Sequence, residues 1–510
     1  MSNTRTFRRT GGLRPGRSVF DLSYEKKFTC EMGQLIPICC DEVVPGDVWT
    51  IGSEILVRAM PLIAPIMHEI NIYTHWFFVP YRLLWNEWEN FITGGRTGNE
   101  APELPRWPNL PRPEGSVADY MGIPPNVSCV GKEPLDFPRR AYYLTFINYY
   151  TDPNLTSDAD LDVNNIGVNS AQNLYNRCWE KDYFTSALPW QQRGTAPALP
   201  ISGITNAEFL GSIAGGYTTN EIGFGQLSGQ LPPGGLTLAG SGSVDGLRQW
   251  LNNNEVDLSQ AATFDVSDLR LAFQIQKWME RNARAGYRYT EFLRSHFGVS
   301  PKDERLDRPE YIGGSKKPLM VSEVLQTSST DSVTPQGNMA GHGISVSGTM
   351  IGTYRVKEYG LILGLMSIMP RTAYSQGIDR QWLRETKYDF YFPEFANLSE
   401  QAIYQAEIMA SNSEAENNRI FGYQGRYDEM RFKRNMICGK MRSDFEHWHL
   451  GRKFSAENPP RLNYSFVRCV PDKRIFEVTT EPGFVVTAGN LIRAVRPMPI
   501  MSQPGLIDHN

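Results

Sequence analysis

The chain has 510 residues, which is enough for two or three domains or for one β-sandwich with large loops. Its 51 Lys and Arg residues nearly balance 55 Asp and Glu residues, and the net charge of -4 excludes a protein that coats nucleic acid with its whole surface. The 45 Gly and 34 Pro residues, together with 12% aromatic residues, favour a folded chain with many turns and long loops over a helical bundle.

The first 20 residues form a basic segment, because they contain five arginines and no acid: Arg5, Arg8, Arg9, Arg14 and Arg17. Interspersed Gly, Thr and Pro residues disfavour a regular helix, so the segment predicts a flexible arm that can follow a phosphate backbone. The alternative is a solvated terminus without a partner. We expect no signal peptide, because the segment has no apolar stretch, and no membrane insertion, because no apolar run approaches the roughly 20 residues of a spanning helix.

The region from residue 34 to residue 80 has the pattern of β-strands. In residues 70–78 apolar and polar side chains mostly alternate, which predicts a strand with one buried face. Residues 83–92 predict a short helix ended by Gly94 and Gly95. Residues 99–165 are rich in Pro, Asn and Asp and predict mainly loop, with an aromatic patch at residues 142–150.

A glycine-rich, almost uncharged segment follows. Residues 195–247 contain no Lys or Arg, and residues 203–246 contain twelve glycines. The composition fits either a linker between two domains or a long insertion that becomes ordered against copies of itself. Beyond it, residues 265–284 predict an amphipathic helix with Ser267 as its cap, and residues 291–297 predict a second helix.

Strand patterns return in the last third of the chain. Residues 344–357 alternate between apolar and polar side chains, and only Ile351 breaks the alternation. Residues 361–369 are continuously apolar, as in a strand covered on both faces. Further strands are predicted at residues 430–438, 464–470, 474–479 and 484–493. Strands early and late in the chain, with loops and helices between them, predict a mainly β sandwich.

Motifs that carry chemistry are scarce. The chain lacks a phosphate-binding G-x-x-x-x-G-K-[ST] loop and a G-x-S-x-G nucleophile elbow, so we predict no catalytic and no cofactor-binding residues. His447 and His449 would share one face of a strand and offer two metal ligands, but hydrogen bonding in a packed region is the simpler interpretation, and we predict no metal site. The seven cysteines fit no metal or disulfide spacing and predict reduced, buried thiols.

Several blocks of sequence resemble the major capsid proteins of the Microviridae, specifically the gokushovirus branch. The resemblance rests on residues 17–38 (RSVFDLSYEKKFTCEMGQLIPI), 75–95 (HWFFVPYRLLWNEWENFITGG), 182–194 (DYFTSALPWQQRG), and 287–343 (with RPEYIGGSKKP). It continues in residues 441–454 (with WHLGRKF), 496–499 (RPMP) and 504–509 (PGLIDH). Residues 195–264 match no block.

The resemblance implies an eight-stranded antiparallel jelly-roll with long inserted loops and a few short helices. In these terms residues 1–20 are the basic arm and residues 21–510 are one jelly-roll domain, in which residues 195–264 build a variable protrusion at the icosahedral threefold axis. It further implies a T=1 shell of about sixty copies with pentamers and threefold contacts, which encloses a circular single-stranded DNA genome. The five arginines of the arm would then face the DNA.

The same resemblance implies a virion protein that assembles in the bacterial host cytoplasm, and no enzyme. Its partners would be copies of itself, the genome, small basic DNA-binding and minor virion proteins, and an unidentified host receptor contacted through residues 203–246. A different class of function is a carbohydrate-active β-sandwich, either a binding module or a glycosidase, in which exposed aromatic rings bind sugars. A monomer with a carboxylate-lined cleft would distinguish this alternative.

Overall fold

The computed structural model describes residues 16–95, 100–107, 112–127, 129–156, 173–194, 266–285, 294–295, 307–325 and 339–501. The chain divides into two units, one formed by residues 192–281 and the other by the remainder. The predicted insertion at residues 195–264 lies outside the described residues, as does the predicted helix at residues 291–297 apart from two helical residues, Arg294 and Ser295.

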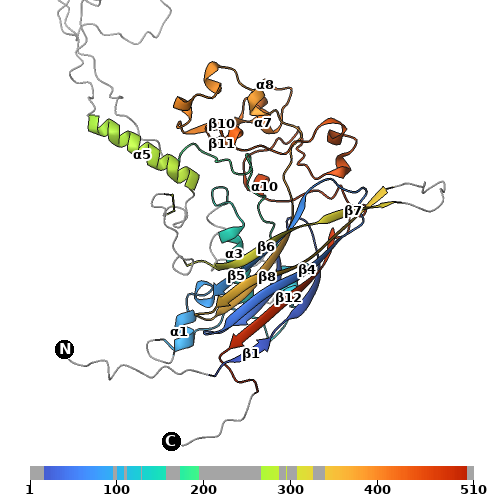
Figure 1. Ribbon diagram of the computed structural model, residues 1–510. Helices are drawn as coiled ribbons and strands as arrows, with labels where there is room; N and C mark the ends of the chain where they lie inside the picture. The colour runs from blue at the N-terminus through green and yellow to red at the C-terminus, as the bar shows by residue number, and fades with distance from the viewer. Residues whose placement is uncertain are drawn as a thin grey trace, which may run out of the picture. The chain divides into compact units, whose positions relative to one another are not determined.

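The larger unit contains a six-stranded antiparallel sheet with the strand order β1-β12-β4-β8-β7, in which β2 also pairs with β12 (Figure 1). Its strands are β1 (Ser18–Asp21), β2 (Tyr24–Cys30), β4 (Val48–Ala59), β7 (Met320–Leu325), β8 (Met339–Arg355) and β12 (Phe484–Arg496). Strands from both ends of the chain therefore lie side by side, as the sequence pattern indicated.

A second antiparallel sheet has the order β3-β9-β5-β6. Its strands are β3 (Ile36–Val43), β5 (Ile70–Pro80), β6 (Glu310–Pro318) and β9 (Gly360–Pro370). Taken in chain order, β2, β3, β4, β5, β6, β8, β9 and β12 form the two sheets of a jelly-roll: they alternate between the sheets except at β5 and β6, which pair with each other in the second sheet, and β1 and β7 extend the first sheet. The predicted mainly β jelly-roll is confirmed.

The core between the sheets is built from alternate residues of their strands. Trp49, Ile51, Trp76, Phe78 and Phe484 are each at most 1% exposed and belong to one hydrophobic cluster. Complete burial of an aliphatic or Phe side chain contributes about 1.5–3 kcal/mol, so this cluster dominates the stability of the sandwich.

Strand β5 is buried on both faces, which corrects the prediction of one buried face. Trp76 and Phe78 point into the sandwich, whereas Phe77 and Val79 pack in a second cluster with helix α3 (Phe137–Tyr149). Strand β9 is completely buried, so the prediction for residues 361–369 is confirmed.

Helix α3 lies within the region that the sequence predicted to be mainly loop. Tyr and Phe are weaker helix formers than Leu or Ala, so the local signal is low. The helix is stabilised instead by burial of Tyr142 and Phe146 and by a buried ion pair, in which Arg139 donates to Asp136 over 2.5 and 2.7 Å. A shorter helix, α2 (Val117–Tyr120), lies in the same region.

The helix predicted at residues 83–92 is divided in two. A 3₁₀ turn, η1 (Tyr81–Leu83), precedes α1 (Trp88–Thr93), and Gly94 ends α1 with a left-handed φ of 76°, as predicted. The predicted helix at residues 265–284 is α5 (Val266–Ala285). Ser267 is not its cap, because the helix begins one residue earlier.

Residues 344–355 belong to strand β8, as predicted, but its apolar positions before the exception do not face the core: Val346 is 77% exposed and Ser345 is buried. The register between β4 and β8 shifts between Ile51 and Gly52, so that β8 pairs through Gly352 and Met350 and skips Ile351. Because of this bulge, the apolar side chains before and after it point to opposite faces of the sheet: Met350 is 69% exposed, whereas Tyr354 packs against the core.

The remaining elements lie mainly between β9 and β12. They are η5 (Arg380–Trp382), η6 (Lys387–Asp389), η7 (Pro393–Phe395), β10 (Glu400–Tyr404), α7 (Gln405–Ile408), α8 (Glu414–Asn417), β11 (Ile420–Gly425), α9 (Asp428–Arg431), η8 (Gly439–Arg442), η9 (Glu446–Trp448) and α10 (Tyr464–Val467). The strands predicted at residues 430–438, 464–470 and 474–479 are wrong, whereas residues 484–493 belong to β12. In α10 the Asn463 side chain accepts from the Phe466 amide over 2.9 Å, and this cap selects a helical turn over a strand.

Candidate assembly and DNA-facing surfaces

A group of large apolar side chains is exposed on the segment between β9 and β10. We call it the aromatic surface; its members are between 43% and 74% exposed and are Trp382, Tyr388, Phe390, Tyr391, Phe392 and Leu398. Monomeric soluble proteins rarely expose such a concentration of apolar side chains, and aromatic residues are enriched in protein interfaces. The surface is therefore a candidate contact between protein molecules.

Local hydrogen bonds explain why the rings of this segment point outward. The buried Tyr427 hydroxyl donates to the Phe390 carbonyl over 3.0 Å and accepts from the Phe392 amide over 3.4 Å. The Arg426 guanidinium donates to the Tyr388 carbonyl over 2.6 Å. The backbone polar groups are thus satisfied on the protein side, which leaves the rings available to a partner.

A buried ionic cluster supports the start of the same segment. The side chain of Glu407 in α7 is 1% exposed and accepts from Arg380 of η5 over 2.6 Å and from the Tyr183 hydroxyl over 3.1 Å. Burial raises the pKa of Glu407, although Arg380 and these hydrogen bonds oppose that effect. The cluster links η5 to α7 and thereby fixes the backbone at the start of the segment that bears the aromatic surface.

Only one arginine of the predicted basic arm is described. Arg17 is exposed and directly precedes β1, so residues 18–20 belong to a strand rather than to the arm. Arg5, Arg8, Arg9 and Arg14 lie outside the described residues.

Two further exposed arginines, Arg355 and Arg493, lie at the end of the six-stranded sheet where β1 begins. Asp21 of β1 pairs with Arg493 of β12, and Arg355 of β8 pairs with Val48 of β4. Sequence reasoning missed both arginines, because only the register of strands distant in the sequence brings them to the end of the sheet where β1 begins. The sole local signal was their polar position in an alternating strand.

The His447-Trp448-His449 motif does not form the predicted strand. Residues Glu446–Trp448 form the 3₁₀ turn η9, so the two imidazoles do not share a strand face. His449 is buried; its Nε2 lies 2.6 Å from the Met441 carbonyl and its Nδ1 accepts from the Gly451 amide over 3.0 Å. Both ring nitrogens are thus engaged in packing, and the described ranges contain no group of three His, Cys, Asp or Glu residues suited to a metal.

All seven cysteines are free, but their environments differ. Cys30, Cys39 and Cys469 are buried, whereas Cys438 is exposed. Burial raises the pKa of Cys178 to about 11, so this thiol stays protonated at neutral pH. The expectation of buried thiols therefore holds for part of the set.

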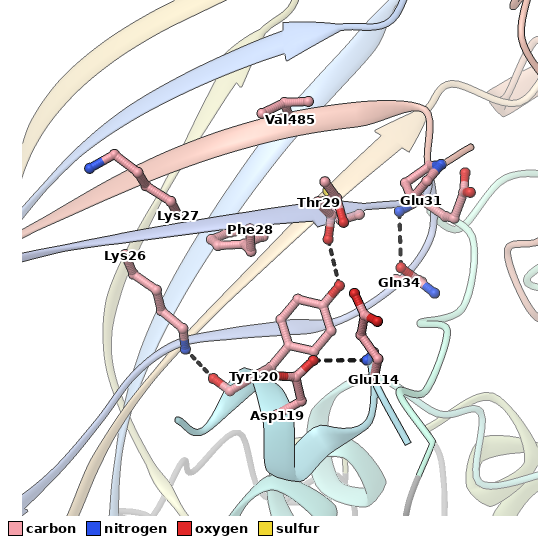
Figure 2. Close-up of a pocket in the computed structure, with 13 residues that line it drawn as sticks. Lys26, Lys27, Phe28, Thr29, Glu31, Gln34, Glu114, Asp119, Tyr120 and Val485 are labelled. Atoms are coloured by element: carbon pink, nitrogen blue, oxygen red, sulfur yellow. Dashed lines mark hydrogen bonds between the residues drawn. The ribbon is translucent and has the colours of Figure 1, made fainter. Parts of the chain in front are cut away.

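A groove of about 770 Å³ lies between β2 and α2 and contains three carboxylates (Figure 2). Two of them stabilise their own surroundings: Asp119 accepts from the Gly115 amide over 2.9 Å, and Glu31 pairs with Lys473 over 2.5 Å. Tyr120 closes one side by donating to the Thr29 carbonyl over 2.5 Å. These bonds hold the surrounding loops together, so Glu31 and Asp119 have structural partners in this groove.

Comparison with known proteins gives a family match along nearly the whole chain. The family model described as "Capsid protein (F protein)" matches residues 12–506. The chain belongs to this family. The capsid protein is 35% identical to "Capsid protein VP1" of Chlamydia phage 1, with 96% of both chains covered. It is 33% identical to the protein of the same name in Bdellovibrio phage phiMH2K (97% and 96% covered) and 32% identical to that of Spiroplasma virus 4 (96% and 95% covered).

The predicted identity and class of function are thereby confirmed. The capsid protein is a structural protein of a small phage and not an enzyme, it assembles with copies of itself into a shell, and its location is the virion. No helix in the part of the chain that the structure describes is long and apolar enough to cross a bilayer.

Proposed function

We propose that this capsid protein builds a T=1 icosahedral shell of about sixty copies, which meet in pentamers and around threefold axes and enclose a circular single-stranded DNA genome. The observation that carries the self-assembly is the aromatic surface, since its side chains include Trp382 at 74% exposure and Phe390 at 53%. In the shell, a neighbouring copy covers these rings. Closed symmetry satisfies every such contact with identical subunits and leaves no free end.

Electron microscopy of the purified protein, combined with sedimentation velocity, tests the shell. We expect closed particles of uniform diameter whose mass corresponds to about sixty subunits. A protein that stays monomeric at high concentration in low and high salt would contradict the proposal. Particles of a larger, variable size would contradict the T=1 geometry but not the assembly.

The DNA-facing role falls to the arm, that is to Arg5, Arg8, Arg9, Arg14 and Arg17. Five arginines neutralise up to five phosphates, and single-stranded DNA loses about 0.7 counterions for each neutralised phosphate. Support comes from Arg355 and Arg493, which extend positive charge from the start of β1 onto the sheet.

Replacement of all five arm arginines by Gln tests this role. Particles of the variant should retain less DNA, and the slope of log K against log salt for oligonucleotide binding should fall by about 3.5. A variant with five Lys residues at the same positions is the matched control, since it keeps the charge. If the Gln variant packages DNA as well as the control, the arm is not DNA-facing.

Residues 195–264 are proposed to form the variable protrusion at the threefold axis, with residues 203–246 contacting the host receptor. The glycine-rich composition without Lys or Arg in residues 203–246 supports a surface insertion and not a DNA-binding element. Deletion of residues 203–246 should abolish attachment to host cells and preserve assembly. Loss of assembly would instead make the segment a contact between subunits.

The other proposed partners are small basic DNA-binding and minor virion proteins, and assembly is proposed to take place in the bacterial host cytoplasm. Basic partners fit the chain's near-neutral charge of -4, because the shell protein alone cannot neutralise a genome. Mass spectrometry of purified virions should find such basic proteins, and virions that consist of this chain and DNA alone would contradict the proposal.

A further inference from the structure

Two adjoining cavities lie in the segment between β9 and β12, outside the surfaces described above. One has a volume of about 290 Å³ and the other about 230 Å³, and they share a wall made of Gly451, Lys453 and Arg474. The first is otherwise lined by Ser375, Gln376, Ala410, Arg442, Glu446 and His449. The second is lined in addition by residues that include Trp179, Arg452, Phe454, Ser465, Arg468 and Asp472.

The lining of both cavities has an excess of positive charge. Its five cations are Arg442, Arg452, Lys453, Arg468 and Arg474, and its two acids are Glu446 and Asp472. Both acids are already neutralised within the wall: Lys453 contacts Glu446 over 2.8 Å and Arg474 contacts Asp472 over 2.6 Å. The lining therefore has a net charge of about +3, in a chain whose total is -4.

Three guanidiniums account for this excess, because Arg442, Arg452 and Arg468 form no ion pair within the described part of the chain. Arg442 and Arg468 are exposed. Arg442 donates from Nε to the Ile437 carbonyl over 2.9 Å, and Arg468 donates to the Asn176 side chain over 3.4 Å. Each of these two guanidiniums keeps further N–H groups that can donate hydrogen bonds to an anion.

Arg452 is held in place by aromatic rings instead of by an acid. Its guanidinium carbon lies 4.0 Å from the centroid of Phe466 and 5.2 Å from that of Trp179, and one terminal nitrogen donates to the Phe466 carbonyl over 2.6 Å. The other terminal nitrogen, Nη1, is buried and has no hydrogen-bond partner. Because Nη1 has no accessible surface, Arg452 acts on an anion in the second cavity through its charge and not through a hydrogen bond from this atom.

The shared wall is rigid. Arg474 donates from Nε to the Glu446 and His449 carbonyls over 3.0 and 3.1 Å, and from Nη2 to the Gly451 carbonyl over 2.7 Å. His449 is tied on its other side to Met441 over 2.6 Å. The histidine of the H-W-H motif thus positions the basic wall, which is preorganised before any ligand arrives.

We propose that the two cavities bind successive phosphate groups of single-stranded nucleic acid. Guanidinium and ammonium groups are the donors that phosphate oxygens prefer, and the shared wall allows two linked phosphates to bind on either side of Lys453 and Arg474. Trp179 is only 6% exposed and is not available for base stacking, so binding is independent of sequence. The inference rests on the proposed enclosure of a DNA genome.

Fluorescence anisotropy of the full chain with labelled (dT)20 tests the site. The variant Arg442→Gln/Arg468→Gln removes two exposed cations and leaves the Arg474 contacts intact, and Lys132→Gln/Arg461→Gln is the matched control outside both cavities. We expect the cavity variant to bind (dT)20 roughly 10- to 30-fold more weakly at 0.1 M salt, with a salt slope lower by about 1.4. The control should bind as the wild type does, and both variants should keep the wild-type melting temperature.

The same pair of substitutions in the chain that carries five Gln residues in the arm separates the cavities from the arm. In that arm variant, the added Arg442→Gln/Arg468→Gln substitutions should remove most of the remaining affinity for (dT)20. Equal affinity of wild type and cavity variant for (dT)20 would overturn the proposal. So would binding of dTMP or inorganic phosphate as tight as that of (dT)20, because it would assign the cavities to a free anion. Failure to form particles at all would refute the proposed function, whereas normal DNA-filled particles with an unchanged cavity variant would refute only this site.

Discussion

The assembly role of the aromatic surface leads to a quantitative prediction for Trp382→Ser. Trp382 is 74% exposed, and a Trp side chain offers up to about 250 Å², so roughly 180 Å² is available to a neighbouring copy. At about 25 cal/mol per Å², complete coverage of that area contributes about 4–5 kcal/mol, and half coverage contributes about 2 kcal/mol. A loss of about 2 kcal/mol per subunit raises the critical concentration for assembly about 30-fold.

The isolated subunit should be almost unaffected, since the ring lies on its surface. Substitutions at such positions change the free energy of unfolding by at most about 0.5 kcal/mol. Sedimentation velocity over a concentration series gives the assembly threshold, and thermal unfolding of the unassembled protein gives the melting temperature. The matched control is Val130→Ser, which alters a side chain that is 76% exposed outside the aromatic surface.

The reasoning is refuted if Trp382→Ser assembles at the wild-type threshold with an unchanged melting temperature. A lower melting temperature would instead show that Trp382 stabilises the subunit. A similar rise in threshold for Val130→Ser would show that apolar exposure alone does not identify the contact.

Three other substitutions probe the subunit itself. Asp136→Asn removes the carboxylate that neutralises two buried or half-buried arginines, so we expect a loss of about 3–5 kcal/mol in the free energy of unfolding, measured by the urea midpoint. Burial lowers the pKa of His75 to about 4, so His75 is neutral in the folded subunit at pH 6.5. The free energy of unfolding should therefore fall by about 3 kcal/mol as the pH falls from about 6.5 to 4. His75→Gln should remove this contribution to acid sensitivity, whereas the separate contribution of His68, whose pKa burial also lowers to about 4, should remain. An acid profile that His75→Gln leaves unchanged would contradict this assignment. Gly377→Ala would place a methyl group against the Glu407 carbonyl oxygen, so we expect a lower melting temperature. The matched control is Gly348→Ala, because Gly348 is exposed and a methyl group there would lie 3.6 Å from its nearest neighbour, Glu54.

The sequence pattern predicted four of the jelly-roll strands individually: alternation predicted β5, β8 and β12, and a continuous apolar run predicted β9, whereas β2 and β6 were not predicted. The covered face matched the apolar positions in β12. In β8 the strand was predicted correctly and its exception, Ile351, marks the bulge, but the apolar Val346 and Met350 before the bulge are 77% and 69% exposed. The pattern failed for β5, which is covered on both faces, and for residues 464–467, where the Asn463 cap stabilises the helical turn α10 in a segment whose sequence resembles a strand. Helix α3 gave little local signal, because its stability comes from packing on β5 and β9.

The sequence alone was sufficient to identify the capsid family and the mainly β class, because motif blocks and alternation are local properties of the chain. Only the tertiary structure decided which side chains meet. It placed Arg355 and Arg493 at the end of the sheet where β1 begins, exposed the rings around Trp382, and gathered five cations around two cavities. These arrangements depend on strand register and on loops packed across distant parts of the chain, and the spacing of residues along the sequence does not encode them in a readable form.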